Sequence, residues 1–257
     1  MMQKVERWSI RLAEILSQWP SIEAVTLGEQ VGKDLYDPHF FISIDAYYSG
    51  SLPAPEERFE SFSFGGGFDF SPFGTKDRFL VDDIPVRIEY LQKDQVASRI
   101  QGKEGLFSFL RENGTYPFYR ILHSRILFSR TEWFEQIRSQ LESMPASFFS
   151  SLRVFFLSRL EHHLNDLEAA SIRGDTLLFL VASGNFVRAL CSTAFAVNKT
   201  FEPSLRILQQ EVWNLPILPE AFHARVENFL RMDPELSMQR KTEIAGLLVK
   251  SFLHLMV

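Results

Sequence analysis

The sequence predicts an α+β protein, in which an N-terminal mixed sheet with flanking helices is followed by an all-α helical bundle. Apolar segments with the alternating pattern of strands fall before about residue 110. After that point, apolar residues recur at the spacing of amphipathic helices, and prolines stand where several helices would begin. These observations predict two domains, 1–110 and 111–257.

The first domain is expected to begin with a helix over residues 3–19, which has an apolar side and stops at Pro20. Residues 50–75 are rich in Ser, Gly, Pro and Phe, and we expect a mobile hairpin or lid there. The triple glycine within it lacks the Lys-Ser/Thr that follows in a phosphate-binding loop. Three strands and a further helix are expected at 22–27, 41–48, 84–91 and 94–101.

All elements after about residue 115 are expected to be helices. Ser129 to Glu132 has the pattern of a capping box, which would open a helix that ends near residue 142. Further helices are expected at 146–170, 175–198, 203–213, 220–231 and 235–256. In the helix 175–198, the side expected to face the core is formed by Leu177, Leu180, Val181, Gly184, Val187, Cys191 and Ala194.

Two of the predicted strands carry acidic residues. Because side chains alternate along a strand, Ser43 shares a face with Asp45, and Arg87 shares a face with Glu89. Carboxylates held on a rigid strand are suitable oxygen ligands for Mg²⁺. The same alternation is typical of an ordinary strand with one solvated face, so the pattern alone leaves both interpretations open.

The residues around these strands resemble a known family. Strand 22–27 ends at Gly28, Ser43-Ile44-Asp45 follows, and Glu89 lies on a later strand. This order resembles the nucleotidyltransferase fold of the DNA polymerase beta superfamily, which has a strand ending in glycine, an Asp-hydrophobic-Asp strand and a third acid. Here the first acid is replaced by Ser43, and Glu29 stands where a serine or a second glycine is usual. The active-site motif is therefore degenerate.

Later segments extend this resemblance over most of the chain. They are similar to parts of bacterial predicted nucleotidyltransferases with a helical C-terminal domain. Residues 76–90 resemble the hairpin that carries the third acid, and residues 119–128 resemble the linker. Residues 195–203 resemble an Ala-Leu-Asn-Arg-x-Tyr-x-Pro element, and residues 215–219 resemble a Leu-Pro-x-x-Pro turn.

The resemblance implies transfer of a nucleoside monophosphate from a nucleoside triphosphate to an acceptor hydroxyl, with Mg²⁺. Asp45 and Glu89 would be the catalytic, metal-binding residues. The residues assigned to nucleotide binding are Gly28, Gln30, Lys33 and Ser43. The alternative is a catalytically degenerate relative that keeps the fold as a binding or regulatory module.

Composition and charge limit the kinds of partner and the cellular location that we expect for this protein. A net charge of −5 and the lack of a long basic patch argue against general nucleic-acid binding. The single cysteine, Cys191, excludes an intramolecular disulfide. The N-terminus is too polar for a signal peptide, and no apolar stretch is expected to span a membrane. We therefore expect a cytoplasmic protein without a membrane partner, and a homo-oligomer remains open.

One other group of residues is of interest as a metal site. His162 and His163 are adjacent, and Asp166 lies four residues after His162. Neighbouring residues on a helix point about 100° apart, so only one of the two histidines is expected to serve a given ion. A solvated polar face is the expected role of these residues.

Overall fold

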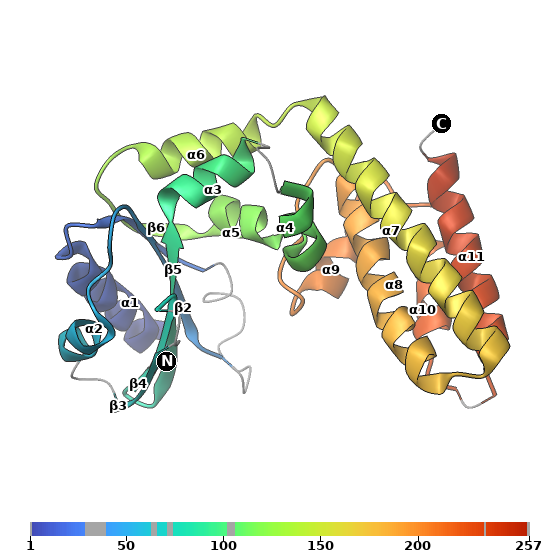
Figure 1. Cartoon of the computed structure of the whole chain (residues 1–257), viewed down its shortest axis with the longest axis horizontal. Coiled ribbons are helices and arrows are strands. Elements are labelled where there is room, and N and C mark those ends of the chain that lie inside the picture. Colours follow the sequence, from blue (N-terminus) through green and yellow to red (C-terminus); the bar gives the residue numbers. More distant parts are fainter. Residues whose placement is uncertain are drawn as a thin grey trace. The chain divides into compact units, whose positions relative to one another are not determined.

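The computed structural model describes residues 2–28, 40–62, 66–70, 74–101, 106–233 and 235–255. It confirms the α+β class, with a mixed sheet followed by a helical region (Figure 1). By contacts, the chain forms two compact units. The sheet unit is Met1–Ser108 with Pro117–Ser143, and the helical unit is Phe109–Tyr116 with Met144–Val257. The expected boundary at 110 falls within helix α4 (Leu106–Asn113).

Within the described residues, the sheet has six strands in the order β3-β4-β5-β2-β1-β6. Strands β2 and β5 pair in parallel, and all the other pairs are antiparallel. The strands are β1 (Ile22–Leu27), β2 (Ile42–Tyr48), β3 (Gly66–Phe70), β4 (Lys76–Val81), β5 (Ile84–Gln92) and β6 (Arg125–Ser129). The strands expected at 22–27, 41–48 and 84–91 therefore agree closely with β1, β2 and β5.

Helix α1 (Met2–Ser17) supplies the core on one face of this sheet. Its buried side chains include Leu12 and Leu16, which belong to the same hydrophobic cluster as Ile44 and Ile88 of the two central strands. Since side chains alternate along a strand, the residues between these apolar positions face the other side. The acidic residues of β2 and β5 lie on that other side.

In the part that the structure describes, residues 50–75 supply one strand of a hairpin with β4, as expected, and also a helix that was not expected. They contain helix α2 (Pro55–Ser61), which starts at a favourable proline, and strand β3. Arg58 of α2 is buried and forms a bidentate ion pair with Asp77 of β4, at 2.9 and 3.2 Å. Tyr90 of β5 donates a further hydrogen bond to Asp77, at 2.7 Å. This buried network fixes α2 against the sheet.

The expectation that only helices follow residue 115 is wrong. Helices α3 (Lys93–Ile100) and α5 (Tyr116–His123) precede strand β6, which pairs with β1 at the sheet edge. Ser129 therefore ends a strand and is not a helix cap, and helix α6 (Trp133–Glu142) begins after Glu132. The pairing with β1 decides the conformation here, because an apolar run as short as this one has no helical periodicity of its own.

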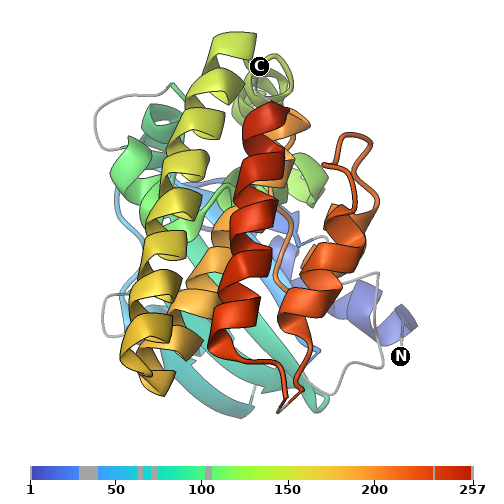
Figure 2. The same ribbon diagram turned by 90° about the vertical axis from the view of Figure 1, so that its right-hand side faces the viewer.

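The helical unit is built around a long hairpin. Helix α7 (Ala146–Arg173) ends at Gly174, whose φ of 66° suits the turn, and α8 (Thr176–Val197) begins with Asp175 accepting a hydrogen bond from the Leu178 amide. Helix α11 lies beside α7 (Figure 2). The remaining helices are α9 (Leu208–Trp213), α10 (Phe222–Leu230) and α11 (Met238–His254).

The expected core side of α8 is right in the C-terminal half of the helix, where Cys191 and Ala194 are buried, and wrong in the N-terminal half. Leu177, Leu180 and Val181 were expected in the core but are exposed, whereas Phe179 and Phe186 are buried. The larger aromatic side chains take the core positions because they bury more apolar surface. By length and composition α8 could cross a membrane, which corrects the expectation of no such stretch. Half of its most apolar segment is buried in the protein, and core helices can have the same length and composition.

Candidate functional site

Strand pairing brings the two predicted acids together. In the parallel pair β2–β5, Asp45 lies directly opposite Glu89, and Ser43 lies opposite Arg87. Residues directly opposite in a sheet project from the same face, so both carboxylates stand side by side on the face away from α1. The sequence-based expectation that these residues share a face of the sheet is therefore met by the geometry.

A single arginine contacts both carboxylates. Arg120 of α5 donates through Nη1 to Glu89 Oε2 at 3.0 Å and through Nη2 to Asp45 Oδ1. The exposed fractions of these side chains are 16% for Arg120, 18% for Glu89 and 1% for Asp45. Water screens a partly buried ion pair less than a surface pair, and the planar guanidinium can donate to two carboxylates at once.

Two more cations border Glu89. Lys76 of β4 lies opposite Glu89 and approaches its Oε1 at 3.0 Å, and Arg87 approaches Oε2 at 3.6 Å. Burial opposes ionisation of Glu89, but the attraction of Arg120 and Lys76 outweighs burial and lowers the pKa of this carboxyl. Glu89 is therefore a carboxylate at neutral pH, surrounded by positive charge.

The described residues around Asp45 and Glu89 do not fit a two-metal Mg²⁺ site. Such a site relies on several carboxylates that offset the charge of the ions. Here Ser43 replaces one acid, and the guanidinium of Arg120 lies between Asp45 and Glu89, where a shared ion would have to bind. A cationic side chain at this position satisfies the charge of the carboxylates and repels a second cation.

The buried end of this face is closed by aromatic residues. Tyr47 follows Asp45 on the same face of β2, and its ring lies 5.7 Å from Trp133 and 4.9 Å from Phe134 of α6. Burial, together with the nearby charge of Asp45, raises the pKa of Tyr47 far above its usual value. The phenol therefore stays neutral and has no role as a base.

Gly28 lies beside Ser43, the other described residue that was assigned to nucleotide binding. However, its amide donates to the Ser43 carbonyl at 2.9 Å, so this N–H continues the β1–β2 ladder. A Cβ on Gly28 would lie 3.1 Å from the Ser43 Cβ, which explains the need for glycine here. The other residues assigned to nucleotide binding, Gln30 and Lys33, lie outside the described residues, as does Glu29.

Sequence reasoning missed Arg120 and Lys76. The only local signal for Arg120 is a charged residue within the mostly apolar helix Tyr116–His123. Lys76 stands in a strand that was expected to be part of a loop or hairpin segment. Both become neighbours of Glu89 only through the pairing and packing of segments that are distant in sequence.

Two of the segments that suggested the family resemblance contact one another in the helical unit. The Asn198 side chain makes two hydrogen bonds to the backbone of Ile217. Its Oδ1 accepts from the Ile217 amide at 2.9 Å, and its Nδ2 donates to the Ile217 carbonyl at 2.7 Å. Nearby, Glu202 is buried and accepts hydrogen bonds from the Thr115 amide at 2.8 Å and from the Ser192 hydroxyl. These side chains hold loops in place and have no other evident chemistry.

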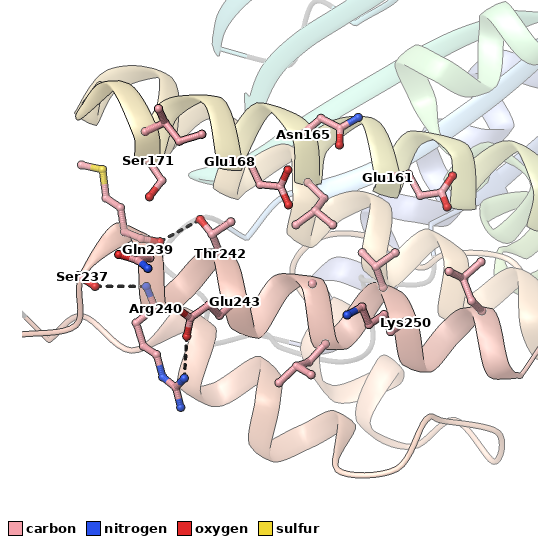
Figure 3. Close-up of a pocket in the computed structure, with 17 residues that line it drawn as sticks. Glu161, Asn165, Glu168, Ser171, Ser237, Gln239, Arg240, Thr242, Glu243 and Lys250 are labelled. Carbon is pink, nitrogen blue, oxygen red and sulfur yellow. Dashed lines mark hydrogen bonds and ion pairs between the residues drawn. The ribbon is translucent and has the colours of Figure 1, made fainter.

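A wide groove in the helical unit is separate from these carboxylates. It lies between α7 and α11 and has a volume of about 1350 Å³. Figure 3 shows Glu161, Asn165 and Glu168 of α7 along one side, and Arg240, Thr242 and Lys250 of α11 along the other. Its mixed charges and open form suggest no specific reaction.

No family model matches the chain, and no curated protein matches it. Among solved structures, it is similar to a crystal structure of a nucleotidyltransferase-like protein from Exiguobacterium sibiricum, with a TM-score of 0.51 and 12% sequence identity. The similarity covers 99% of this chain and 75% of that one. At this level of identity the similarity concerns the fold, and this chain has a nucleotidyltransferase-like fold.

Proposed function

We propose that this protein is a catalytically degenerate nucleotidyltransferase-like module that binds a nucleoside phosphate without a divalent ion. The observation that supports this proposal most is the contact of Arg120 with both Asp45 and Glu89. The guanidinium takes the place of the cation that a nucleotidyltransferase would hold. Membership of the DNA polymerase beta superfamily is part of the same proposal.

The charge of the site suits an anionic ligand. Three cations (Arg120, Lys76 and Arg87) and two carboxylates (Asp45 and Glu89) give a net charge of +1. Lys76 and Arg87 are about one-third exposed, so a ligand can reach them. Arginine and lysine are well suited to phosphate oxygens, and Arg87 can bind them with two parallel hydrogen bonds.

A second candidate is an active nucleotidyltransferase that transfers a nucleoside monophosphate to an acceptor hydroxyl. The position of Asp45 opposite Glu89 on adjacent strands favours it, because two acids placed in this way form the core of a nucleotidyltransferase active site. It requires Arg120 to move away from both carboxylates when Mg²⁺ and nucleotide bind. The two candidates therefore make opposite predictions about divalent ions.

The test is calorimetric titration of the full chain with each nucleoside triphosphate, in Mg²⁺ and in EDTA. We expect binding of similar affinity in both, no release of pyrophosphate, and weaker binding by Arg87→Met and Lys76→Met. Arg125→Met is the matched control, because Arg125 is exposed and pairs with Glu6. Pyrophosphate release that depends on Mg²⁺, and that Asp45→Asn and Glu89→Gln each abolish, would instead establish the transferase.

Removing the internal cation provides a stricter test. In the double variant Ser43→Asp, Arg120→Met, three carboxylates would face one another without the guanidinium between them. We expect this variant to gain a thermal stabilisation by Mg²⁺ or Mn²⁺ that the wild-type protein lacks. Equal stabilisation of both proteins by Mg²⁺ would show that Arg120 does not occupy the cation position.

A further inference from the structure

A second group of charged and polar residues lies on α7, in the helical unit. His162 Nε2 and His163 Nδ1 are 3.7 and 3.5 Å from Asp166 Oδ2, and the three atoms lie within 4.8 Å of one another. Both histidines therefore approach the same carboxylate, although neighbouring residues on a helix were expected to serve different ions. The helix directs the two Cβ atoms apart, but the imidazole rings present different nitrogens to the same carboxylate.

His163 is the most informative member of this group. Its side chain is only 9% exposed, and its buried Nδ1 makes no well-formed hydrogen bond, because its nearest acceptor, Asp166 Oδ2, is 3.5 Å away. A buried polar atom without a partner costs free energy, so such an atom in a folded protein requires an explanation. Its position beside Asp166 and His162 suggests that the missing partner is a ligand bound by all three residues.

The donor set favours a transition metal over Mg²⁺ or Ca²⁺. Imidazole nitrogens suit Zn²⁺ and its neighbours, whereas Mg²⁺ and Ca²⁺ prefer oxygen ligands. Zn–N distances of about 2.0–2.1 Å in a tetrahedral site place ligand atoms about 3.4 Å apart, close to the two separations from Asp166.

We propose that His162, His163 and Asp166 form a binding site for Zn²⁺ or a similar transition metal, with water completing the coordination. The site is independent of the sheet unit and of the proposed nucleotide binding. Of the three ligands, Asp166 and His162 are partly or largely exposed, so an ion can enter from solvent. The same exposure allows both residues to be changed without disturbing the core of the helical unit.

The experiment is a titration of the full chain, freed of metal by a chelator, with Co²⁺ as a spectroscopic substitute for Zn²⁺. We expect one equivalent of Co²⁺ to give the strong visible absorption of a tetrahedral site with nitrogen ligands, and Zn²⁺ to displace it. His162→Gln and Asp166→Asn should each weaken Co²⁺ binding by about tenfold or more, since losing a direct ligand costs at least as much as losing an outer-shell partner.

Glu168→Gln is the matched control, because Glu168 is an exposed carboxylate two residues after Asp166 on the same helix. This variant should bind Co²⁺ as the wild-type protein does. His163→Ala is informative only if circular dichroism shows that the helical unit remains folded. The proposal is overturned if the wild-type protein gives no tetrahedral absorption, or if Asp166→Asn and Glu168→Gln bind Co²⁺ equally well.

Discussion

Replacing Arg120 with methionine should destabilise the sheet unit strongly. The variant keeps most of the side-chain volume but leaves Asp45, which is 1% exposed, without the guanidinium that contacts it. Removing one partner of a buried ion pair costs about 3–5 kcal/mol. We expect a loss of about 3 kcal/mol, at the lower end, because Glu89 keeps Lys76 and Arg87 as neighbours.

The effect should depend on pH with a defined sign. The pKa of Glu89 is lowered in the folded protein from 4.5, so its ionisation stabilises the fold above that value. This contribution is lost as the pH falls through the lowered folded pKa. Since Arg120 is one cause of the lowered pKa, the difference in stability between wild-type protein and Arg120→Met should narrow as the pH falls below 4.5.

Urea unfolding followed by tryptophan fluorescence can measure this loss. Trp8, Trp19 and Trp133 belong to the sheet unit, so a Trp213→Phe background restricts the signal to that unit. Arg125→Met is the control and should cost less than about 1 kcal/mol, because its ion pair with Glu6 is exposed. If Arg120→Met costs no more than this control at pH 7, the buried ion pair does not have the role described here.

Four other substitutions, at three positions, test the buried polar groups. In thermal unfolding at pH 7, Glu202→Gln should be at least as stable as the wild-type protein. Burial raises the pKa of Glu202, so ionisation of this carboxyl destabilises the fold increasingly as the pH rises, and glutamine cannot ionise. Glu202→Ala should lose about 2 kcal/mol of stability, because it leaves the Thr115 amide without its acceptor. Gly114→Ala should cost about 2 kcal/mol in the same assay, since a Cβ would overlap Glu202 Oε2 and φ is +61°. In urea unfolding, Arg58→Met should lower the free energy of unfolding by about 3–5 kcal/mol, because it leaves the fully buried Asp77 without its ion-pair partner. The control is Arg7→Met, which removes an exposed ion pair and should cost less than about 1 kcal/mol. A loss as small as this for Arg58→Met would contradict the prediction.

The central strands were predictable because their signal is local. Alternation in β2 and β5 placed Ile44 and Ile88 on one face and Asp45 and Glu89 on the other, as the structure has them. Strand β6 was not predictable in this way. Its apolar centre suits a helix or a strand equally, and only its pairing with β1, about 100 residues earlier, selects the strand.

The candidate site was predictable only in part for the same reason. Asp45 and Glu89 were found from their own strands, but Arg120 is 75 residues from Asp45 in the sequence and reaches it through the packing of α5. The error in the side of α8 that was expected to face the core has a different cause. Leu177 and Leu180 fit an apolar face by spacing, but Phe179 and Phe186 compete for the core and occupy it.

The sheet order has a consequence for how this protein emerges from the ribosome. Strand β1 pairs with β6, and β2 pairs with β5, so the sheet is incomplete until the chain has been synthesised to about residue 129. Until then, β1 has an unpaired edge that is open to aggregation. The hairpin of α7 and α8 has no such delay, because its two helices are neighbours in the chain. We therefore expect a chaperone to matter most before the chain has been synthesised to about residue 129.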